Sequence, residues 1–253
     1  ILYHARPHIG TDKLPGVVRS IRSRIQSLGG HVLFHTKLEE LLVHGGALRG
    51  IRAGGQEYDC SCLILAIGHS ARDTFSMLDR LGIPMASKPF SIGLRIEHKQ
   101  QMIDRAQYGT FAGHQALGAA EYRLNLRTKA GRGVYTFCMC PGGEVVAAAS
   151  EKDGVVINGM SRFARDGENA NSALLVGVEP ADYGDHPLSG VAFQRYWEEQ
   201  AYALGGGGYR APAQLVGDLL RGVPSRGHGS VRPSYRPGVR YTDLKDCLPG
   251  FVL

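Results

Sequence analysis

Residues 62–74, with the sequence CLILAIGHSARDT, constrain the fold more than any other stretch of the chain. They open with a continuous apolar run, which is typical of a strand buried on both faces of a parallel sheet. The run breaks at Gly68, after which Ser70 or Asp73 can cap a helix. Open α/β sheets place ligands at such turns, where a glycine lets a cofactor approach the backbone. An ordinary strand-to-helix connection explains the stretch equally well.

The residues before this stretch predict a helix followed by a β-meander. Apolar residues recur at three- and four-residue steps over residues 12–28, and Thr11 or Asp12 can cap that helix. A short strand is expected over residues 31–35. Strands separated by pairs of glycines are then predicted over residues 37–43, 48–53 and 56–60. This order of elements predicts an α/β fold.

The sequence changes character after Pro84, where we place a domain boundary. A half-buried strand is expected over residues 90–97, and a helix over residues 100–107. Glycine-containing turns separate the remaining strand candidates, which predict an antiparallel sheet. These candidates are residues 122–127, 134–139, 145–149, 155–158 and 173–178, with helices over 191–204 and 212–220. The second part of the chain is therefore expected to be α+β.

Charge and cysteine content exclude several classes of protein. The net charge of +6 lies largely in residues 205–245, where a nucleic-acid-binding motif is not recognisable, so a solvated face or an anion pocket is the better interpretation. The apolar runs are too short to span a membrane. Five cysteines, an odd number, do not suggest a secreted disulfide framework, and their spacing gives no metal site. A reducing, cytoplasmic location is expected.

A complete dinucleotide-binding domain should carry a glycine fingerprint after its first strand, because the cofactor's pyrophosphate needs a glycine loop and a helix N-terminus. The one formal match, at Gly206, Gly208 and Ala211, follows a predicted helix and is rejected. If the chain contains a dinucleotide domain, the half that holds the pyrophosphate is expected to be absent from it.

Residues 135–143 contain the most unusual chemistry, with Cys138 and Cys140 on one predicted strand. Alternate strand residues share a face, so the two thiols could meet a flavin, a substrate or each other. Burial of two small side chains is the commoner explanation for free cysteines. Cys60 and Cys62 have the same spacing, and for them a structural role is favoured more strongly.

Several motifs together resemble one family, the FAD-dependent proteins described as NAD(FAD)-utilising dehydrogenases. The motifs that carry the resemblance are residues 7–14 (PHIGTDKL), 66–73 (AIGHSARD), 88–93 (KPFSIG), 137–143 (FCMCPGG), 158–161 (NGMS), 165–171 (RDGENAN) and 211–218 (APAQLVGD). The resemblance covers the middle of these longer flavoproteins. It implies a glutathione-reductase-like architecture, in which residues 1–83 form part of a three-layer FAD/NAD(P)-binding domain and residues 84–253 an inserted antiparallel β domain with helices.

The resemblance also implies positions for the cofactor. The strand before the meander would deliver a backbone contact to the adenine near Thr36, Lys37 and Leu38. The turn Ala66, Ile67 and Gly68 would lie beside FAD, with Ile67 replacing the family's usual threonine. NAD(P)H is the electron donor that the resemblance suggests.

The leading hypothesis from the sequence is a segment of a FAD-dependent oxidoreductase with an unidentified small-molecule substrate. In it, Cys138 and Cys140 are the candidates for direct redox participation. The alternative is a truncated, non-catalytic fragment or binding module that does not retain FAD by itself. The sequence indicates no oligomeric state.

Overall fold

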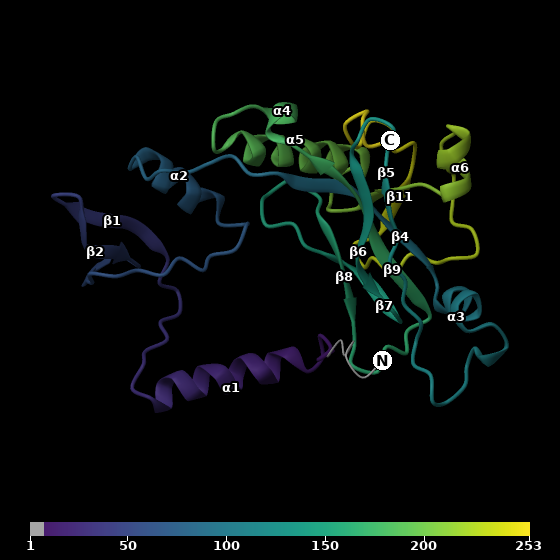
Figure 1. Ribbon diagram of the computed structural model, residues 1–253, viewed down its shortest axis with the longest axis horizontal. Helices are drawn as coiled ribbons and strands as arrows, with labels where there is room; N and C mark the ends of the chain where they lie inside the picture. Colours follow the sequence, from purple (N-terminus) through teal and green to yellow (C-terminus); the bar gives the residue numbers. More distant parts are fainter. Residues whose placement is uncertain (1–7) are drawn as a thin grey trace.

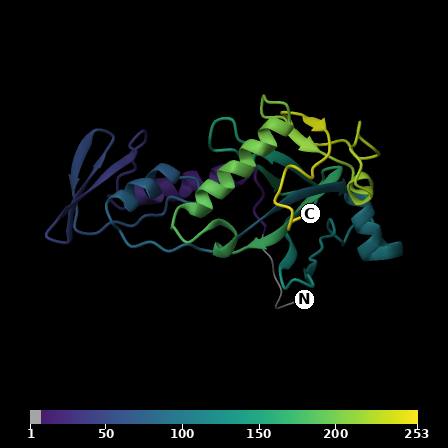
Figure 2. The same cartoon turned by 90° about the horizontal axis from the view of Figure 1, so that it is seen from above.

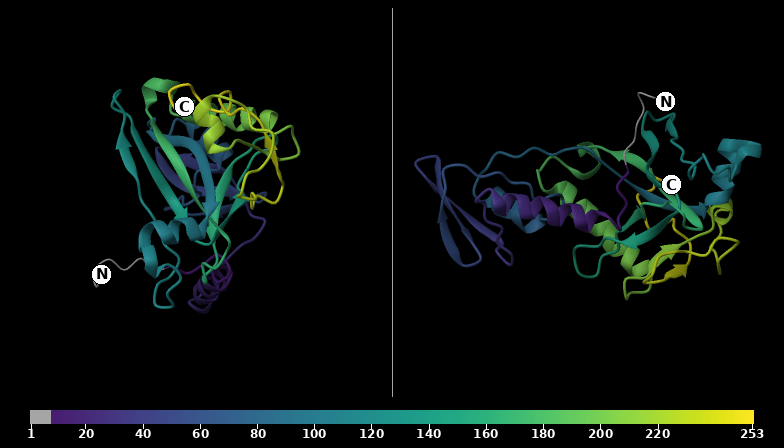
Figure 3. Two further views of the ribbon diagram at one scale, coloured as in Figure 1. Left: turned by 90° about the vertical axis from the view of Figure 1, so that its right-hand side faces the viewer. Right: turned by 90° about the horizontal axis from the view of Figure 1, so that it is seen from below.

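The β-meander lies at one end of an elongated molecule, and a larger α+β body lies at the other (Figures 1, 2 and 3). The computed structural model describes residues 8–253, so Pro7 of the 7–14 motif lies outside the described residues. Helix α1 (Leu14–Ser27) runs between the two ends, from the body to the segment that enters the meander (Figure 1). The expected mixture of helices and antiparallel sheets is confirmed.

The predicted helix over residues 12–28 is confirmed as α1, which contains Pro15 in its first turn. Its cap differs from expectation: Lys13 is the N-cap residue and makes no side-chain cap bond. None of its residues is buried, and its apolar side chains remain exposed, Ile21 by 56% for example. The amphipathic pattern thus predicted the helix correctly. Within the described residues, no other element packs on its apolar face and buries it.

The meander consists of β1 (Leu38–His44), β2 (Ala47–Ala53) and β3 (Gln56–Asp59), which pair in that order. Both pairings are antiparallel, as the glycine turns predicted. The strand predicted over residues 31–35 is not formed, because this segment has no ladder partner in the described chain.

The buried strand predicted over residues 62–67 is also wrong. These residues form no strand, and Ile64 is 85% exposed. A strand of this type requires neighbours on both sides to pair its backbone, and none lies beside it among residues 8–253. The helix predicted after Gly68 is present as α2 (Arg72–Arg80). Asp73 accepts a hydrogen bond from the Thr74 amide rather than acting as the N-cap, which is Ala71.

A four-stranded antiparallel sheet is the centre of the body. It is built from β4 (Phe90–Lys99), β9 (Asn169–Val178), β6 (Gly133–Cys140) and β5 (Asn125–Arg127), in that spatial order. Strands β4 and β9 pair over ten residues without a register shift, from Phe90 opposite Val178 to Lys99 opposite Asn169. Strand β6 pairs with β9 but contains a register shift between Phe137 and Cys140.

A hairpin of β7 (Gly143–Ala147) and β8 (Ile157–Ser161) follows β6, and a parallel pair is formed by β10 (Ala211–Ala213) and β11 (Val239–Tyr241). The main core lies between this hairpin, the long helix α5 (Ser189–Leu204) and the C-terminal segment. Its buried residues are Val145, Val155, Ala201, Ala211, Tyr235, Leu244 and Cys247.

The other helices are α3 (Gln100–Tyr108), the 3-10 helix η1 (Gly109–Phe111), α4 (Pro180–Tyr183) and α6 (Val216–Arg221). The helix predicted over residues 212–220 thus begins later than expected, because Pro212 belongs to β10. Within the described residues, no helix has the length and hydrophobicity needed to cross a lipid bilayer.

Candidate functional site

Four of the sequence motifs, one near residue 10 and three between residues 137 and 171, meet at one cavity of about 620 Å³ in the body. The cavity is lined by Thr11 and Asp12 from the first motif and by Gly142 from the turn after β6. Met160 of β8 and the pair Asp166 and Gly167 complete these contributions. Charged side chains lie at the same cavity, among them Arg162, Arg236 and Glu144. The fold therefore gathers residues that the sequence left in separate segments.

Backbone hydrogen bonds attach the first motif to the cavity wall. The Thr11 amide donates to the Ser161 carbonyl at 3.1 Å, and the Thr11 hydroxyl donates to the same oxygen at 3.2 Å. The Phe163 amide donates to Asp12 Oδ1 at 2.8 Å, and this bond lowers the pKa of the Asp12 carboxyl. Asp12 thus secures the start of α1 to the segment after β8 instead of capping the helix.

The turn at Gly142 is equally constrained. The Gly142 amide donates to Gln100 Oε1 at 2.8 Å, and its carbonyl accepts a bond from the Gly167 amide at 3.2 Å. Its φ of +52° favours glycine, and a Cβ there would lie 2.0 Å from the Arg165 carbonyl oxygen. Only glycine lets these two segments approach so closely.

Cys138 and Cys140 precede this turn, and they occupy different environments. The register shift in β6 is a β-bulge, and Cys138 within it has a φ of +48°. Cys138 is exposed, whereas Cys140 is 6% exposed. The simple alternation that we expected for the two residues is therefore interrupted. The Cys140 thiol donates to the Cys138 carbonyl at 3.2 Å.

Burial, together with the neighbouring Cys138 thiol, raises the pKa of Cys140 to about 11. Cys140 is therefore a neutral thiol at neutral pH. The bulge holds an exposed sulfur next to a buried, protonated one.

A guanidinium group lies beside the two thiols. Arg95 of β4 donates from Nη1 to Asn171 Oδ1 at 2.8 Å and from Nη2 to Asn158 Oδ1 at 3.3 Å. Its Nη1 also lies 3.5 Å from the Cys138 carbonyl oxygen. Burial lowers the pKa of Arg95. The nearby thiols of Cys140 and Cys138 act in the opposite direction and raise this pKa. Among residues 8–253, no carboxylate forms an ion pair with this arginine.

The four residues predicted to contact a cofactor lie at the other end of the molecule, near the meander (Figure 1). Leu38 begins β1, and Ala66, Ile67 and Gly68 lead into α2. An exposed ion pair between Lys37 and Asp73 links these two segments, and it raises the pKa of Lys37 and lowers that of Asp73. The structure thus groups the predicted residues into two places, the meander end and the thiol bulge.

Comparison with known proteins gives one family. The family model "FAD-dependent protein, C-terminal domain-like" matches residues 89–253, from the start of β4 to the end of the chain. The chain belongs to this FAD-dependent protein family. An uncharacterised protein of Clostridium beijerinckii is 51% identical over 255 residues, which cover the whole chain and 48% of that relative. The chain therefore spans about half the length of this Clostridium beijerinckii relative.

The residues of this FAD-dependent family member at the meander end fit one part of a flavin cofactor's environment. Gly68 has a φ of +68°, and nothing lies within 4 Å of the position that its Cβ would occupy. Ala66 and Gly68 are exposed, so a cofactor can approach the backbone directly. The glycine fingerprint that would hold the pyrophosphate is not recognisable in the sequence.

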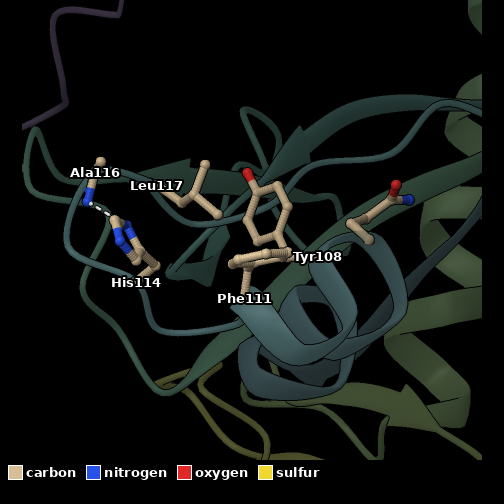
Figure 4. Close-up of a pocket in the computed structure, with 6 residues that line it drawn as sticks. Tyr108, Phe111, His114, Ala116 and Leu117 are labelled. Carbon is tan, nitrogen blue, oxygen red and sulfur yellow. Dashed lines mark hydrogen bonds between the residues drawn. The ribbon is translucent and has the colours of Figure 1, made fainter.

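A second cavity, of about 510 Å³, lies beside α3 in the body (Figure 4). Tyr108 and Phe111 form its apolar wall, together with Leu117. The imidazole of His114 accepts a hydrogen bond from the Ala116 amide at 3.1 Å, which uses one ring nitrogen for local structure. This cavity contains no pair of reactive groups, and we assign no chemistry to it.

Sequence reasoning missed Arg95, Asn171 and the cavity formed by the four motifs. Arg95 gave no distinct signal, because it occupies a polar position of the alternating strand pattern, as Ser91 and Glu97 do. The cavity was signalled only by the polar loop residues at Asp166 and Gly167, which are equally common in solvated turns.

Several cations of the basic 205–245 segment have partners within the chain. Arg221 pairs with Asp218 at 2.6 Å, and Lys245 with Asp243 at 3.5 Å. Arg236 reaches Glu144 beside the first cavity at 3.6 Å. These pairs support the interpretation of a solvated protein face for much of this segment.

Proposed function

We propose that this chain forms part of a FAD-dependent oxidoreductase in which Cys138 and Cys140 are a redox-active thiol pair. The left-handed backbone at Cys138 is the observation that carries this proposal. Such a conformation in a residue other than glycine costs on the order of 1–2 kcal/mol, and strain of this kind concentrates at functional sites. Membership of a FAD-dependent family supports redox chemistry in particular.

The difference in exposure gives each thiol a role. The thiolate of exposed Cys138 attacks one sulfur of a substrate disulfide, forms a mixed disulfide and releases the first substrate thiol, which takes up a proton. The buried Cys140 sulfur loses its proton and attacks Cys138, which releases the second substrate thiol and leaves a Cys138–Cys140 disulfide. Two electrons and two protons pass from the pair to the substrate in total.

A flavin would supply the electron pair that restores the dithiol, with NAD(P)H as the proposed donor. Leu38, Ala66, Ile67 and Gly68 are the residues that we propose for contacts to this cofactor. The exposure of Ala66 and Gly68 and the open space at Gly68 support that assignment.

We propose the corresponding division of the chain as well. Residues 1–83 contribute to a FAD-binding domain, and residues 84–253 form the inserted domain that carries the thiols. The start of the family match at residue 89 and the end-to-end arrangement in Figure 1 support this division.

The thiol pair is tested by oxidising the protein in glutathione redox buffers and mapping its cysteines by mass spectrometry after alkylation. We expect a reversible two-hydrogen loss in the peptide that contains Cys138 and Cys140, which Cys138→Ser and Cys140→Ser each abolish. The matched control is the pair Cys60 and Cys62, which has the same spacing but lies outside the β-bulge of β6. If both thiols stay fully alkylatable at every potential, the redox role fails.

The visible spectrum of the purified chain separates the enzyme from the alternative of a non-catalytic module. Flavin absorption close to one cofactor per chain supports the enzyme, and its complete absence supports the module. In a flavin-loaded protein, we expect the double variant Cys138→Ala/Cys140→Ala to lose disulfide reduction while flavin binding is retained. Undiminished disulfide reduction in that variant would show that the pair takes no part.

A further inference from the structure

Arg95 is a half-buried cation whose described partners are all neutral. Its hydrogen bonds go to the side-chain oxygens of Asn171 and Asn158, and its Nη1 lies near the Cys138 carbonyl. Asn158 and Cys138 are both exposed, so the outer edge of the guanidinium lies close to the molecular surface. Placing a charge in a protein without a counter-ion is costly unless another interaction compensates it.

Two donors in this cluster have no partner. Asn171 is 0% exposed, and its Nδ2 makes no hydrogen bond, nor does the buried Nε of Arg95. Buried donors are satisfied in the great majority of native sites, so each exception calls for an explanation. The cluster has an excess of N–H donors and a shortage of acceptors.

The titratable groups around Arg95 do not neutralise it at neutral pH. Burial raises the pKa of the Tyr122 phenol and, with Cys138, raises that of Cys140 to about 11. Burial also lowers the pKa of His98, whose Nε2 bonds to the Tyr122 hydroxyl at 2.8 Å. These three groups are therefore neutral, and the positive charge of Arg95 remains beside the exposed sulfur of Cys138.

We propose that Arg95 binds an anionic group of the substrate beside Cys138, so that the substrate class is a small disulfide carrying carboxylates. This inference rests on the thiol exchange proposed above, because it assigns the substrate of that same site. A carboxylate at the outer edge of the guanidinium would give Arg95 the anionic partner that it lacks, and a guanidinium is well suited to bind it. Binding there places the substrate's disulfide next to the attacking sulfur.

The test compares three small disulfides of similar size and different charge: dithiodiglycolate, hydroxyethyl disulfide and cystamine. The Cys140→Ser variant traps the mixed disulfide at Cys138, and peptide mass spectrometry measures its rate of formation. Exposed Cys62 provides an internal reference in every sample. We expect the ratio of the dithiodiglycolate rate to the cystamine rate to be about tenfold higher at Cys138 than at Cys62, as a nearby positive charge requires.

Substitution of Arg95 decides whether this preference comes from the guanidinium. Arg95→Gln should reduce the ratio at Cys138 to that at Cys62, and Arg95→Lys should retain part of it. Equal ratios at Cys138 in the Arg95→Gln variant and its parent would overturn the inference. Where Arg95→Gln does not fold, salt provides the measurement: the preference at Cys138 should disappear in 1 M salt, and a preference absent already at low salt also overturns the inference.

Failure of the proposed function gives a different result. If Cys138 reacts with none of the three disulfides while Cys62 does, thiol exchange at this site is wrong, and the substrate assignment fails with it. If all three react at Cys138 without charge preference, thiol exchange stands and the assignment of Arg95 alone fails.

Discussion

Gly159 lies where three side chains of the thiol cluster meet. A Cβ at this position would lie 2.2 Å from Asn171 Oδ1, 2.4 Å from Arg95 Nη1 and 2.9 Å from Cys140 Sγ. Distances this short force a shift of β8 or of the cluster itself. The spacing of β8 from Arg95 therefore depends on the absence of a side chain at one residue.

We expect Gly159→Ala to destabilise the fold by about 1–3 kcal/mol, the usual cost of overpacking. Urea unfolding followed by fluorescence measures the change. Gly118→Ala is the matched control, because nothing lies within 4 Å of its Cβ position, and its effect should stay within about 0.5 kcal/mol. Equal stability of the two variants would mean that the side chains around Gly159 move to admit a Cβ without a loss of unfolding free energy.

Individual elements show which features could be read from the sequence. Helices α1 and α2 and the meander were predicted because their periodicity and turn glycines are local signals. The strand predicted over residues 62–67 is wrong for a different reason: a strand needs pairing partners, and a local pattern does not reveal whether they are present. Cys138 and Cys140 were found by residue type, but the bulge that separates their environments depends on pairing with β9.

The carboxylate of Asp182 makes two kinds of contact at the short helix α4. Asp182 accepts a hydrogen bond from the Glu179 amide at 2.9 Å, and it accepts two from Arg132, at 2.8 and 2.5 Å. The bond from Arg132 is the main cause that lowers the pKa of Asp182. Asp182 thus shares the capping box at the helix start with Glu179 and links this start to the turn before β6.

We expect Asp182→Ala to destabilise the protein by about 1–2 kcal/mol, since it removes half of the capping box and the ion-pair partner of Arg132. Thermal unfolding measures this. Asp185→Ala, two residues after the helix, is the control, and its effect should be within about 0.5 kcal/mol. A loss no larger in Asp182→Ala than in the control would contradict the role of the carboxylate.

At the scale of the whole molecule, one buried arginine attaches the meander end to the body. Arg72 of α2 is 5% exposed and bonds to Glu151 as well as to Glu198 of α5, the latter at 2.6 and 3.0 Å. Arg195 adds a bidentate bond to Glu151 at 2.8 and 2.9 Å. Four charged groups from three segments therefore form one network.

We expect Arg72→Ala to cost about 3–5 kcal/mol, because it leaves the partly buried carboxylates without their shared cation. Chemical unfolding measures the loss, and limited proteolysis should show faster cleavage over residues 81–89. Arg80→Ala on the same helix is the control, because Arg80 is exposed. Unchanged proteolysis in Arg72→Ala would show that other contacts hold α2 to the body.

The same network predicts a dependence of stability on pH. The bonds from Arg195 and Arg72 lower the pKa of Glu151 from its usual 4.5 to about 2. A depressed carboxyl pKa stabilises the folded state above the unfolded value, and this contribution is lost as pH falls from about 4.5 to about 2. Its size is on the order of 3 kcal/mol.

We expect the midpoint of thermal unfolding to fall across this pH window, and to fall less in Glu151→Gln, which has no carboxyl to titrate. Exposed Asp246→Asn should leave the slope unchanged. If Glu151→Gln retains the full acid-dependent loss, other carboxyls are responsible.

The attachment of Thr11 to Ser161 joins residues 150 positions apart in the chain. Closing a loop of this length costs conformational entropy before any contact compensates it, so such contacts form late during folding. The β7–β8 hairpin must exist before the first motif can bind to its end. We expect the Thr11 amide to acquire protection from hydrogen exchange after the amides of that hairpin, in pulse-labelling experiments. The cavity where the motifs meet is then completed only at the end of folding, so incompletely folded chains lack it.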